Sequence, residues 1–278
     1  MQPTLLLPNC KINIGLNIVS KRPDGYHNLE TVFYPIGLRD NLEFKEITDT
    51  NEPYRLICTG VPKAGNTADN LIVKVYLSLK DEFDLPPLEL TLYKHIPTGA
   101  GLGGGSSDAA FMMKGLNEAY DLGLSNDDME RRLSAFGADC AFFVKNRPAY
   151  ATGIGNELSP IALSLKGKFI VMVKPETVIS TKEAYAHVVP KPAKHPLLQA
   201  VMQPIEQWRG LIVNDFEDSV FPTYPELAAI KQTLYDMGAC YAAMSGSGST
   251  LYGIFDRPVP EAKKVFAKYF VFTQNIVG

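Results

Sequence analysis

Five glycines fall within the seven residues 99–105, and Ser106, Ser107 and Asp108 follow directly. Each glycine raises the entropic cost of ordering the backbone by roughly 0.5–1 kcal/mol relative to alanine, so this composition needs a reason. The segment lies between a predicted strand over 88–95 and a predicted helix over 109–120. Free amides at a helix start suit a polyphosphate, and the two serine hydroxyls suit phosphate oxygens or Mg²⁺. The alternative is a flexible connector.

The predicted elements and motifs next to the glycines indicate which class of nucleotide-binding site this segment forms. Gly99, Gly101 and Gly104 have the spacing of a dinucleotide-binding turn. Two predicted helices follow, however, over 109–120 and 125–136, instead of a helix, a parallel strand and an acidic residue. No lysine followed by serine or threonine completes a Walker A sequence, and the protein-kinase signatures are absent. The segment therefore predicts a different nucleotide-binding class.

Composition limits the partners. The 278 residues are 46% hydrophobic, which is enough for a full core without disulfides. The 27 basic and 30 acidic residues give a net charge of −3, so we expect neither a nucleic-acid nor a membrane partner. Four scattered cysteines lack zinc-ligand spacing and favour a reducing compartment. We therefore expect a soluble, cytoplasmic protein that acts on small molecules, as a monomer or weak homodimer.

The order of predicted elements indicates an α+β fold with two domains. The first part is rich in strands and then in helices, and ends in a hairpin over 149–152 and 157–161. The second part reads strand, helices, strand, strand, helix, strand, which matches a ferredoxin-like split βαβ arrangement. We place the boundary at Lys166, giving domains 1–165 and 166–278. The second part is predicted to contain strands 169–173, 239–244, 250–255 and 270–277, a helix that begins at a Ser180/Glu183 capping box, and helices near 197–213, 225–237 and 260–269.

Three further segments could carry chemistry. Lys11 and Asn13 share one face of a strand with period-two alternation and one buried face, which is either a solvated face or part of a site. Asp139 lies in the largely apolar segment 136–143, where it either caps a short helix or, beside Lys11, accepts a proton from a hydroxyl. The small residues over 244–250 form either a hairpin turn or a second wall of a phosphate pocket.

These motifs, in order, resemble those of the GHMP small-molecule kinases over the whole chain. The segments that carry the resemblance are 8–13, 22–27, 101–110, 137–139 and 244–248. The Arg-Pro-Asp-Gly-Tyr-His sequence over 22–27 resembles a narrower branch, which phosphorylates the 2-hydroxyl of 4-diphosphocytidyl-2-C-methyl-D-erythritol in non-mevalonate isoprenoid (terpenoid) biosynthesis. The resemblance implies an N-terminal ATP-binding domain, a C-terminal substrate domain, ATP as co-substrate and Mg²⁺.

The resemblance also implies roles for individual residues. Asp139 matches the catalytic base and Lys11 its charge partner. The implied ATP phosphate-binding residues are Pro97, Gly99, Gly101, Leu102, Gly103, Gly104, Gly105, Ser106 and Ser107. The implied acceptor-binding residues are Asn13, Tyr26, His27, Thr181, Tyr185, Ser245, Gly246 and Ser247. Ser107 and Asp108 are the candidate Mg²⁺ ligands.

Two of these assignments carry an explicit alternative. Tyr26 and His27 match positions that recognise cytosine, and Tyr185 is either the second stacking aromatic or a core residue. Asp108 would repel the ATP phosphates unless a metal ion or a basic side chain intervenes.

Other functions fit parts of the pattern. A related kinase could act on mevalonate-pathway or amino-alcohol acceptors. An oxidoreductase could use the dinucleotide-like glycine spacing. A nucleotide-sensing module would bind ATP without turnover, but the presence of both Lys11 and Asp139 argues against it.

Overall fold

The computed structural model describes residues 3–48, 50–61 and 69–277, and they form two compact units. Unit 1 contains residues up to 11, 35–98 and 103–147, and unit 2 contains 12–34, 99–102 and 148 onward. Strands β2 (Asn9–Lys21) and β3 (His27–Arg39) each contribute residues to both units. No single cut therefore separates the units, and the predicted boundary at residue 166 lies inside unit 2.

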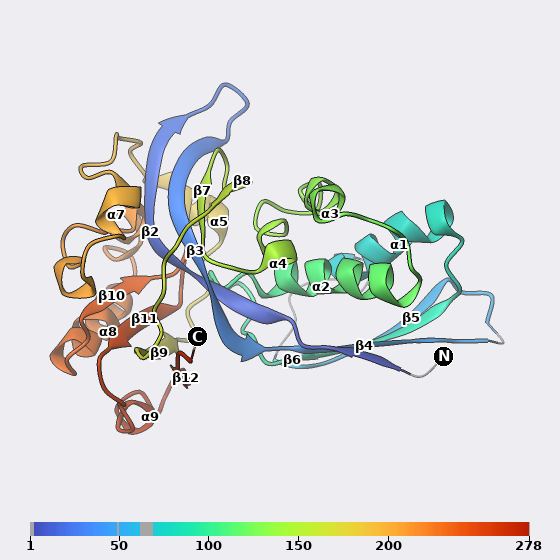
Figure 1. Cartoon of the computed structure of the whole chain (residues 1–278). Helices are drawn as coiled ribbons and strands as arrows, with labels where there is room; N and C mark the ends of the chain where they lie inside the picture. The colour runs from blue at the N-terminus through green and yellow to red at the C-terminus, as the bar shows by residue number, and fades with distance from the viewer. Residues whose placement is uncertain (1–2, 49, 62–68, 278) are drawn as a thin grey trace. The chain divides into compact units, whose positions relative to one another are not determined.

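A four-stranded sheet with the order β1-β4-β6-β5 forms the base of unit 1. Its strands are β1 (Thr4–Leu6), β4 (Asn41–Glu46), β5 (Tyr54–Gly60) and β6 (Leu88–Lys94). Strand β5 runs parallel to β6, and the other pairs are antiparallel. Leu88, Leu90 and Leu92 alternate toward one buried face, as period-two patterning predicts. Helices α1 (Leu71–Phe83) and α2 (Gly104–Ala119) cover one face of the sheet (Figure 1).

The helices of unit 1 begin where local capping allows. Helix α1 is capped by Asn70, whose side chain accepts the N–H of Ile72. Helix α2 begins at Gly104, five residues before the expected start, so the last two glycines of the segment form its first turn. Helix α3 (Asn126–Leu133), expected over 125–136, is capped by Ser125, and α4 (Phe142–Lys145) follows.

Unit 2 contains the predicted ferredoxin-like sheet, which is antiparallel with the order β10-β11-β9-β12. Its apolar core includes Leu227, Ile230 and Leu234 of α8, which contacts β10 and β11. The expected helices over 197–213 and 260–269 are shorter in the structure, and α7, capped by Asn214, was not predicted. The elements are β9 (Phe169–Lys174), α5 (Thr181–Ala186), α6 (Leu197–Ala200), η2 (Ile205–Gln207), α7 (Asp215–Val220), α8 (Pro225–Asp236), β10 (Tyr241–Met244), β11 (Leu251–Phe255), α9 (Ala262–Val265) and β12 (Phe270–Asn275).

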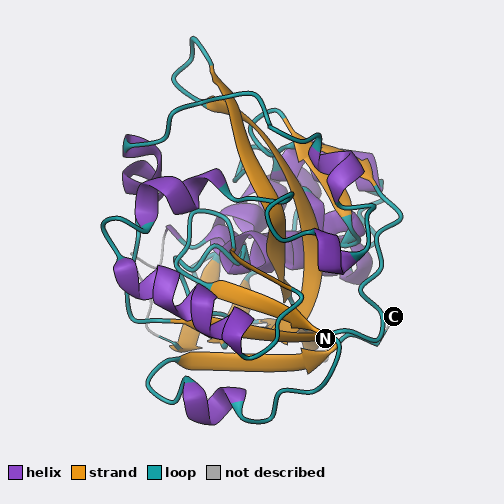
Figure 2. Ribbon diagram, turned by 90° about the vertical axis from the view of Figure 1, so that its left-hand side faces the viewer, coloured by secondary structure: helices purple, strands orange, loops and turns teal. Residues whose placement is uncertain are grey.

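A third sheet has the order β2-β3-β7-β8, with β7 (Ala149–Thr152) and β8 (Glu157–Pro160) forming the predicted hairpin. Figure 2 shows the long β2–β3 hairpin and its connecting turn. The expectation of one buried face on β2 is wrong, because residues 9–18 are buried on both faces. Lys11 and Asn13 are therefore not on a solvated strand face.

Within the described ranges, no helix is long and apolar enough to cross a lipid bilayer.

Candidate functional site

Lys11 and Asp139, 128 positions apart in the sequence, form an ion pair in unit 1. Lys11 Nζ lies 3.2 Å from Asp139 Oδ2. The lysine side chain is 3% exposed, whereas the aspartate is 32% exposed and so remains accessible to a bound molecule. Strand β2 supplies the lysine, and the turn between α3 and α4 supplies the aspartate. The N-cap of α4 is Ala141, so Asp139 does not cap that helix.

The end of the glycine segment lies against this pair. A Cβ on Gly103 would lie 3.1 Å from both Lys11 Cε and Phe143 Cζ, and the residue has φ +68°. Both observations require glycine, because a side chain would be strained and would displace the lysine. Gly103 is the N-cap of α2, whose first amides have no partners within the helix. A cation, an accessible carboxylate and a helix N-terminus therefore meet at one place in unit 1.

A second charged cluster lies beneath the start of α2. The Lys94 ammonium bonds Asp108 Oδ2 at 2.6 Å and also bonds Asp40 Oδ2. Asp40 Oδ1 accepts the backbone N–H groups of His95 at 2.6 Å and Ile96 at 2.8 Å. All three charged side chains of this cluster are buried. Burial raises the pKa of the Asp108 carboxyl to about 7, since lost hydration and the Asp40 carboxylate outweigh the attraction of Lys94.

This cluster bears on the expected Mg²⁺ ligands. The Asp108 carboxylate is buried and bound to Lys94. Of the two groups expected to offset its negative charge, a metal ion or a basic side chain, the structure therefore has the basic side chain. A carboxylate that is buried and held by a lysine does not suit Mg²⁺, which keeps several of its water ligands. Ser107 Oγ is buried without a hydrogen-bond partner in the first turn of α2, which fits an oxygen that awaits a ligand. Asp108 Oδ1 is also buried without a hydrogen-bond partner, but Lys94 holds the other oxygen of that carboxylate, so Ser107 is the better candidate.

In unit 2, residues 100–101 of the glycine segment contact the second small-residue segment, residues 244–250. Ser245 Oγ donates to the carbonyl of Gly101 at 2.8 Å and accepts the N–H of Asn13 at 3.2 Å. The segment connects the paired strands β10 and β11, so it is a hairpin turn that also contacts residues 100–101. The fully buried Ser245 hydroxyl is used within the protein, whereas Ser247 is half-buried. The side-chain amide of Asn13 donates to Thr31 Oγ1 at 2.9 Å.

The aromatic residues expected to bind a base also lie in unit 2. The His27 and Tyr185 rings are stacked with centroids 4.7 Å apart and planes 19° apart. Tyr185 also meets Phe216 edge to face at 4.8 Å, so its ring packs between the core and His27. Tyr26 is 61% exposed. Burial, with a smaller effect from Lys21, lowers the pKa of His27, which favours the neutral ring.

The other expected residues occupy varied environments. Leu102 is buried, Gly105 faces open space, Ser106 is half-buried, and Thr181 is exposed in the first turn of α5. Gly246 lies close to the Asn13 side chain, since a Cβ there would be 3.2 Å from Asn13 Oδ1. Thr31, which donates to the Gly15 carbonyl at 2.6 Å, and Asp40 were not anticipated from the sequence.

Comparison with known proteins agrees with this arrangement. The model of the GHMP kinases N terminal domain matches residues 70–147, and that of the GHMP kinases C terminal domain matches residues 197–271. The chain therefore belongs to the GHMP kinase family, and it is an enzyme. The predicted boundary at residue 166 falls between the two matches.

Individual relatives are more specific. A 4-diphosphocytidyl-2-C-methyl-D-erythritol kinase of Bacteroides thetaiotaomicron is 53% identical over 91% of this chain and 92% of its own length. One of the same name from Bacteroides fragilis is 51% identical over 98% and 99%. A crystal structure of 4-(cytidine 5'-diphospho)-2C-methyl-D-erythritol kinase has a TM-score of 0.83 at 28% identity, covering 99% of this chain and 100% of that chain. Mevalonate kinase of Methanococcus jannaschii, 14% identical with a TM-score of 0.69, shares the fold.

Proposed function

We propose that this protein transfers the γ-phosphoryl group of ATP to the 2-hydroxyl of 4-diphosphocytidyl-2-C-methyl-D-erythritol. The observation that carries the proposal is the Lys11–Asp139 pair beside Gly103 and the start of α2. The names of the relatives at about half identity support the choice of acceptor. This reaction belongs to the non-mevalonate synthesis of isoprenoid precursors, and we assign the protein to the cytoplasm.

Asp139 is the base in this proposal. One oxygen of the Asp139 carboxylate takes the proton of the acceptor hydroxyl while the hydroxyl oxygen forms a bond to the γ-phosphorus. The bond from the γ-phosphorus to the β,γ-bridging oxygen breaks, and ADP leaves. Lys11 orients the carboxylate through their 3.2 Å contact and places positive charge beside the transferring group.

The first turn of α2 supplies amide donors for the ATP phosphates in this proposal. Gly105, where a side chain would meet open space, leaves room for the phosphates to approach the backbone, and the helix dipole favours negative charge there. Mg²⁺, when bound with ATP, would neutralise phosphate charge, and Ser107 is the protein oxygen that fits it. Gly99, Gly101 and Leu102 complete the proposed phosphate-binding segment.

Tyr26 and His27 bind the cytidine end of the acceptor in the proposal, and Tyr185 holds the His27 ring through their stack. The His27–Tyr185 stack is too close for a base to enter between its two rings. We therefore place the cytosine against the exposed ring of Tyr26, with the neutral His27 offering one ring nitrogen as donor and the other as acceptor. Thr181 and Ser247 offer exposed or half-exposed hydroxyls to the diphosphate and the polyol.

Acceptor-dependent ADP release tests the proposed substrate. Wild-type protein with Mg·ATP should release ADP when 4-diphosphocytidyl-2-C-methyl-D-erythritol is added, and CMP or CDP should compete with the acceptor. Mevalonate and homoserine serve as control acceptors and should give no release. Turnover of either control acceptor at a comparable rate, without competition by CMP, would assign a different substrate within the same family.

A further inference from the structure

The buried cluster of Lys94, Asp40 and Asp108 is not used in the proposed chemistry, yet it contacts both flanks of the glycine segment. Asp40 Oδ1 accepts the N–H groups of His95 and Ile96, the residues directly before Pro97. Asp108 belongs to the second turn of α2, directly after Ser107. The Lys94 ammonium bonds both aspartates, so one side chain joins the entry to the segment with the helix that follows it.

Close packing strengthens this link. A Cβ on Gly104 would lie 2.9 Å from Ile96 Cγ2 and 3.4 Å from Lys94 Nζ, so the first turn of α2 rests directly on the cluster. Asp40 is 0%, Asp108 2% and Lys94 5% exposed, so water cannot replace a lost partner. Removing one partner of such a buried charged network leaves the others unsatisfied and free to rearrange. The position of the α2 amides therefore depends on these three side chains.

We propose that Lys94, Asp40 and Asp108 are positioning residues for ATP, because they fix the first turn of α2 relative to the strand that leads into the glycine segment. They act through the backbone and do not touch the nucleotide. This inference rests on the proposed phosphate-binding role of that turn. It predicts that breaking the link weakens ATP binding while the affinity for the cytidine acceptor is kept.

Two substitutions at Asp108 separate positioning from a requirement for the negative charge. Asp108→Asn and Asp108→Leu both remove the negative charge in a similar volume, but only asparagine keeps an oxygen that can accept from Lys94. We expect Asp108→Leu to weaken Mg·ATP binding about tenfold or more and Asp108→Asn by less than about threefold. Lys94→Met, which breaks the same link from the other side, should match Asp108→Leu. Lys114→Met removes a lysine elsewhere on α2 and is the control, with a change below about twofold.

Calorimetry of Mg·ATP binding without acceptor gives the readout, together with binding of the acceptor to each variant. Equal losses in Asp108→Asn and Asp108→Leu would overturn the proposal, since a requirement for the negative charge treats the two alike. A loss in Asp108→Leu that Lys94→Met does not share would also overturn it, since a metal role would involve the carboxylate and not the lysine. Unchanged ATP binding in Asp108→Leu and Lys94→Met, or an equal loss for ATP and acceptor, would also overturn it. If the wild-type protein binds ATP but does not phosphorylate the acceptor, the proposed substrate is wrong and this comparison still holds.

Discussion

Single residues in the glycine segment have different reasons to be glycine. Gly101 has φ +74°, and a Cβ there would lie 1.9 Å from the Ser245 carbonyl oxygen. Gly105 has nothing within 4 Å of such a Cβ and lies in the first turn of α2. Packing therefore requires glycine at residue 101. It does not require glycine at residue 105.

Alanine substitutions should therefore diverge between these two positions. Gly101→Ala should destabilise the fold by roughly 2–5 kcal/mol, combining a left-handed backbone with overpacking. Gly105→Ala is the matched control and should be neutral or stabilising by up to about 1 kcal/mol, because alanine favours a helix. Urea unfolding of both variants measures the difference. Equal stabilities would show that residue 101 does not pack against Ser245 as described.

The raised pKa of Asp108 predicts a pH-dependent stability. A carboxyl whose pKa rises from 3.8 to about 7 on folding binds a proton more tightly in the folded state. Its contribution is therefore fully present below about pH 4 and is lost as the pH rises through about 7, by at most about 4 kcal/mol. Asp108→Asn lacks this titration. The stability of Asp108→Asn relative to wild type should therefore rise between about pH 5 and pH 8 in urea unfolding, and a constant difference would contradict the pKa.

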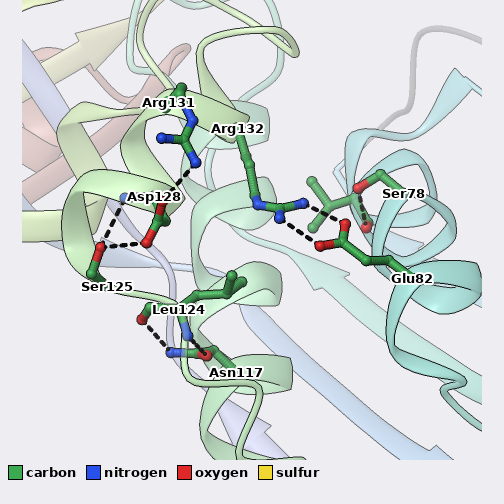
Figure 3. Close-up of polar contacts among 9 residues, drawn as sticks. Ser78, Glu82, Asn117, Leu124, Ser125, Asp128, Arg131 and Arg132 are labelled. Carbon is green, nitrogen blue, oxygen red and sulfur yellow. Dashed lines mark hydrogen bonds and ion pairs between the residues drawn. The ribbon is translucent and has the colours of Figure 1, made fainter.

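At the scale of elements, local signals predicted helix starts better than helix ends. Ser125 accepts the Asp128 N–H at 3.1 Å and donates to its carboxylate at 2.7 Å, as the capping pattern predicts. Arg132 of α3 then makes two 2.7 Å bonds to Glu82 of α1 (Figure 3). The α2 start was misplaced because three consecutive glycines disfavour a helix intrinsically, whereas packing against Ile96 and Lys94 overrides that preference.

The Ser125 cap should have a measurable effect on stability alone. Ser125→Ala removes the acceptor for the Asp128 N–H and should cost about 1 kcal/mol. Ser134→Ala, at the other end of α3, is the control and should change stability by less than about 0.5 kcal/mol. Thermal unfolding measures both, with ADP release as the activity check. A cost no larger than that of the control would mean that Ser125 does not stabilise the helix start.

The buried charged cluster could have been predicted from period-two patterning. Lys94 continues the alternating series of buried residues Leu88, Leu90 and Leu92. Asp40, which joins β3 to β4, likewise lies two residues from the buried Leu38 and Leu42. Charges in such positions require partners of opposite sign. Which carboxylate meets Lys94 could not be predicted, because that depends on how α2 packs on the sheet.

At the scale of the whole molecule, motif order predicted the fold and the family, whereas domain limits required coordinates. The ferredoxin-like sheet follows from the order of its elements, and the Lys11–Asp139 pairing was a spatial expectation that the structure confirms. The division into units was not predictable, because a strand pattern over 9–21 does not indicate that β2 takes part in two cores.

The assignment of separate residues to the two substrates predicts a split in affinity. His27→Ala removes the ring nitrogens that the proposal assigns to the cytosine and should weaken acceptor binding about tenfold, since an unsatisfied hydrogen-bond partner costs about 1–3 kcal/mol. ATP binding should change by less than about twofold. His187→Ala, at an exposed position after α5, is the control. Calorimetry with each substrate separates these results, and an equal loss for ATP and acceptor would contradict the cytidine assignment.

The central claim is that Asp139, held by Lys11, accepts the proton of the acceptor hydroxyl. Its most direct test is single-turnover transfer of the γ-phosphoryl group from labelled ATP to the acceptor at saturating concentrations of both. Asp139→Asn should slow this transfer roughly 10²–10⁴-fold while ATP and acceptor dissociation constants stay within about threefold of wild type. Transfer by Asp139→Asn at the wild-type rate would contradict the account.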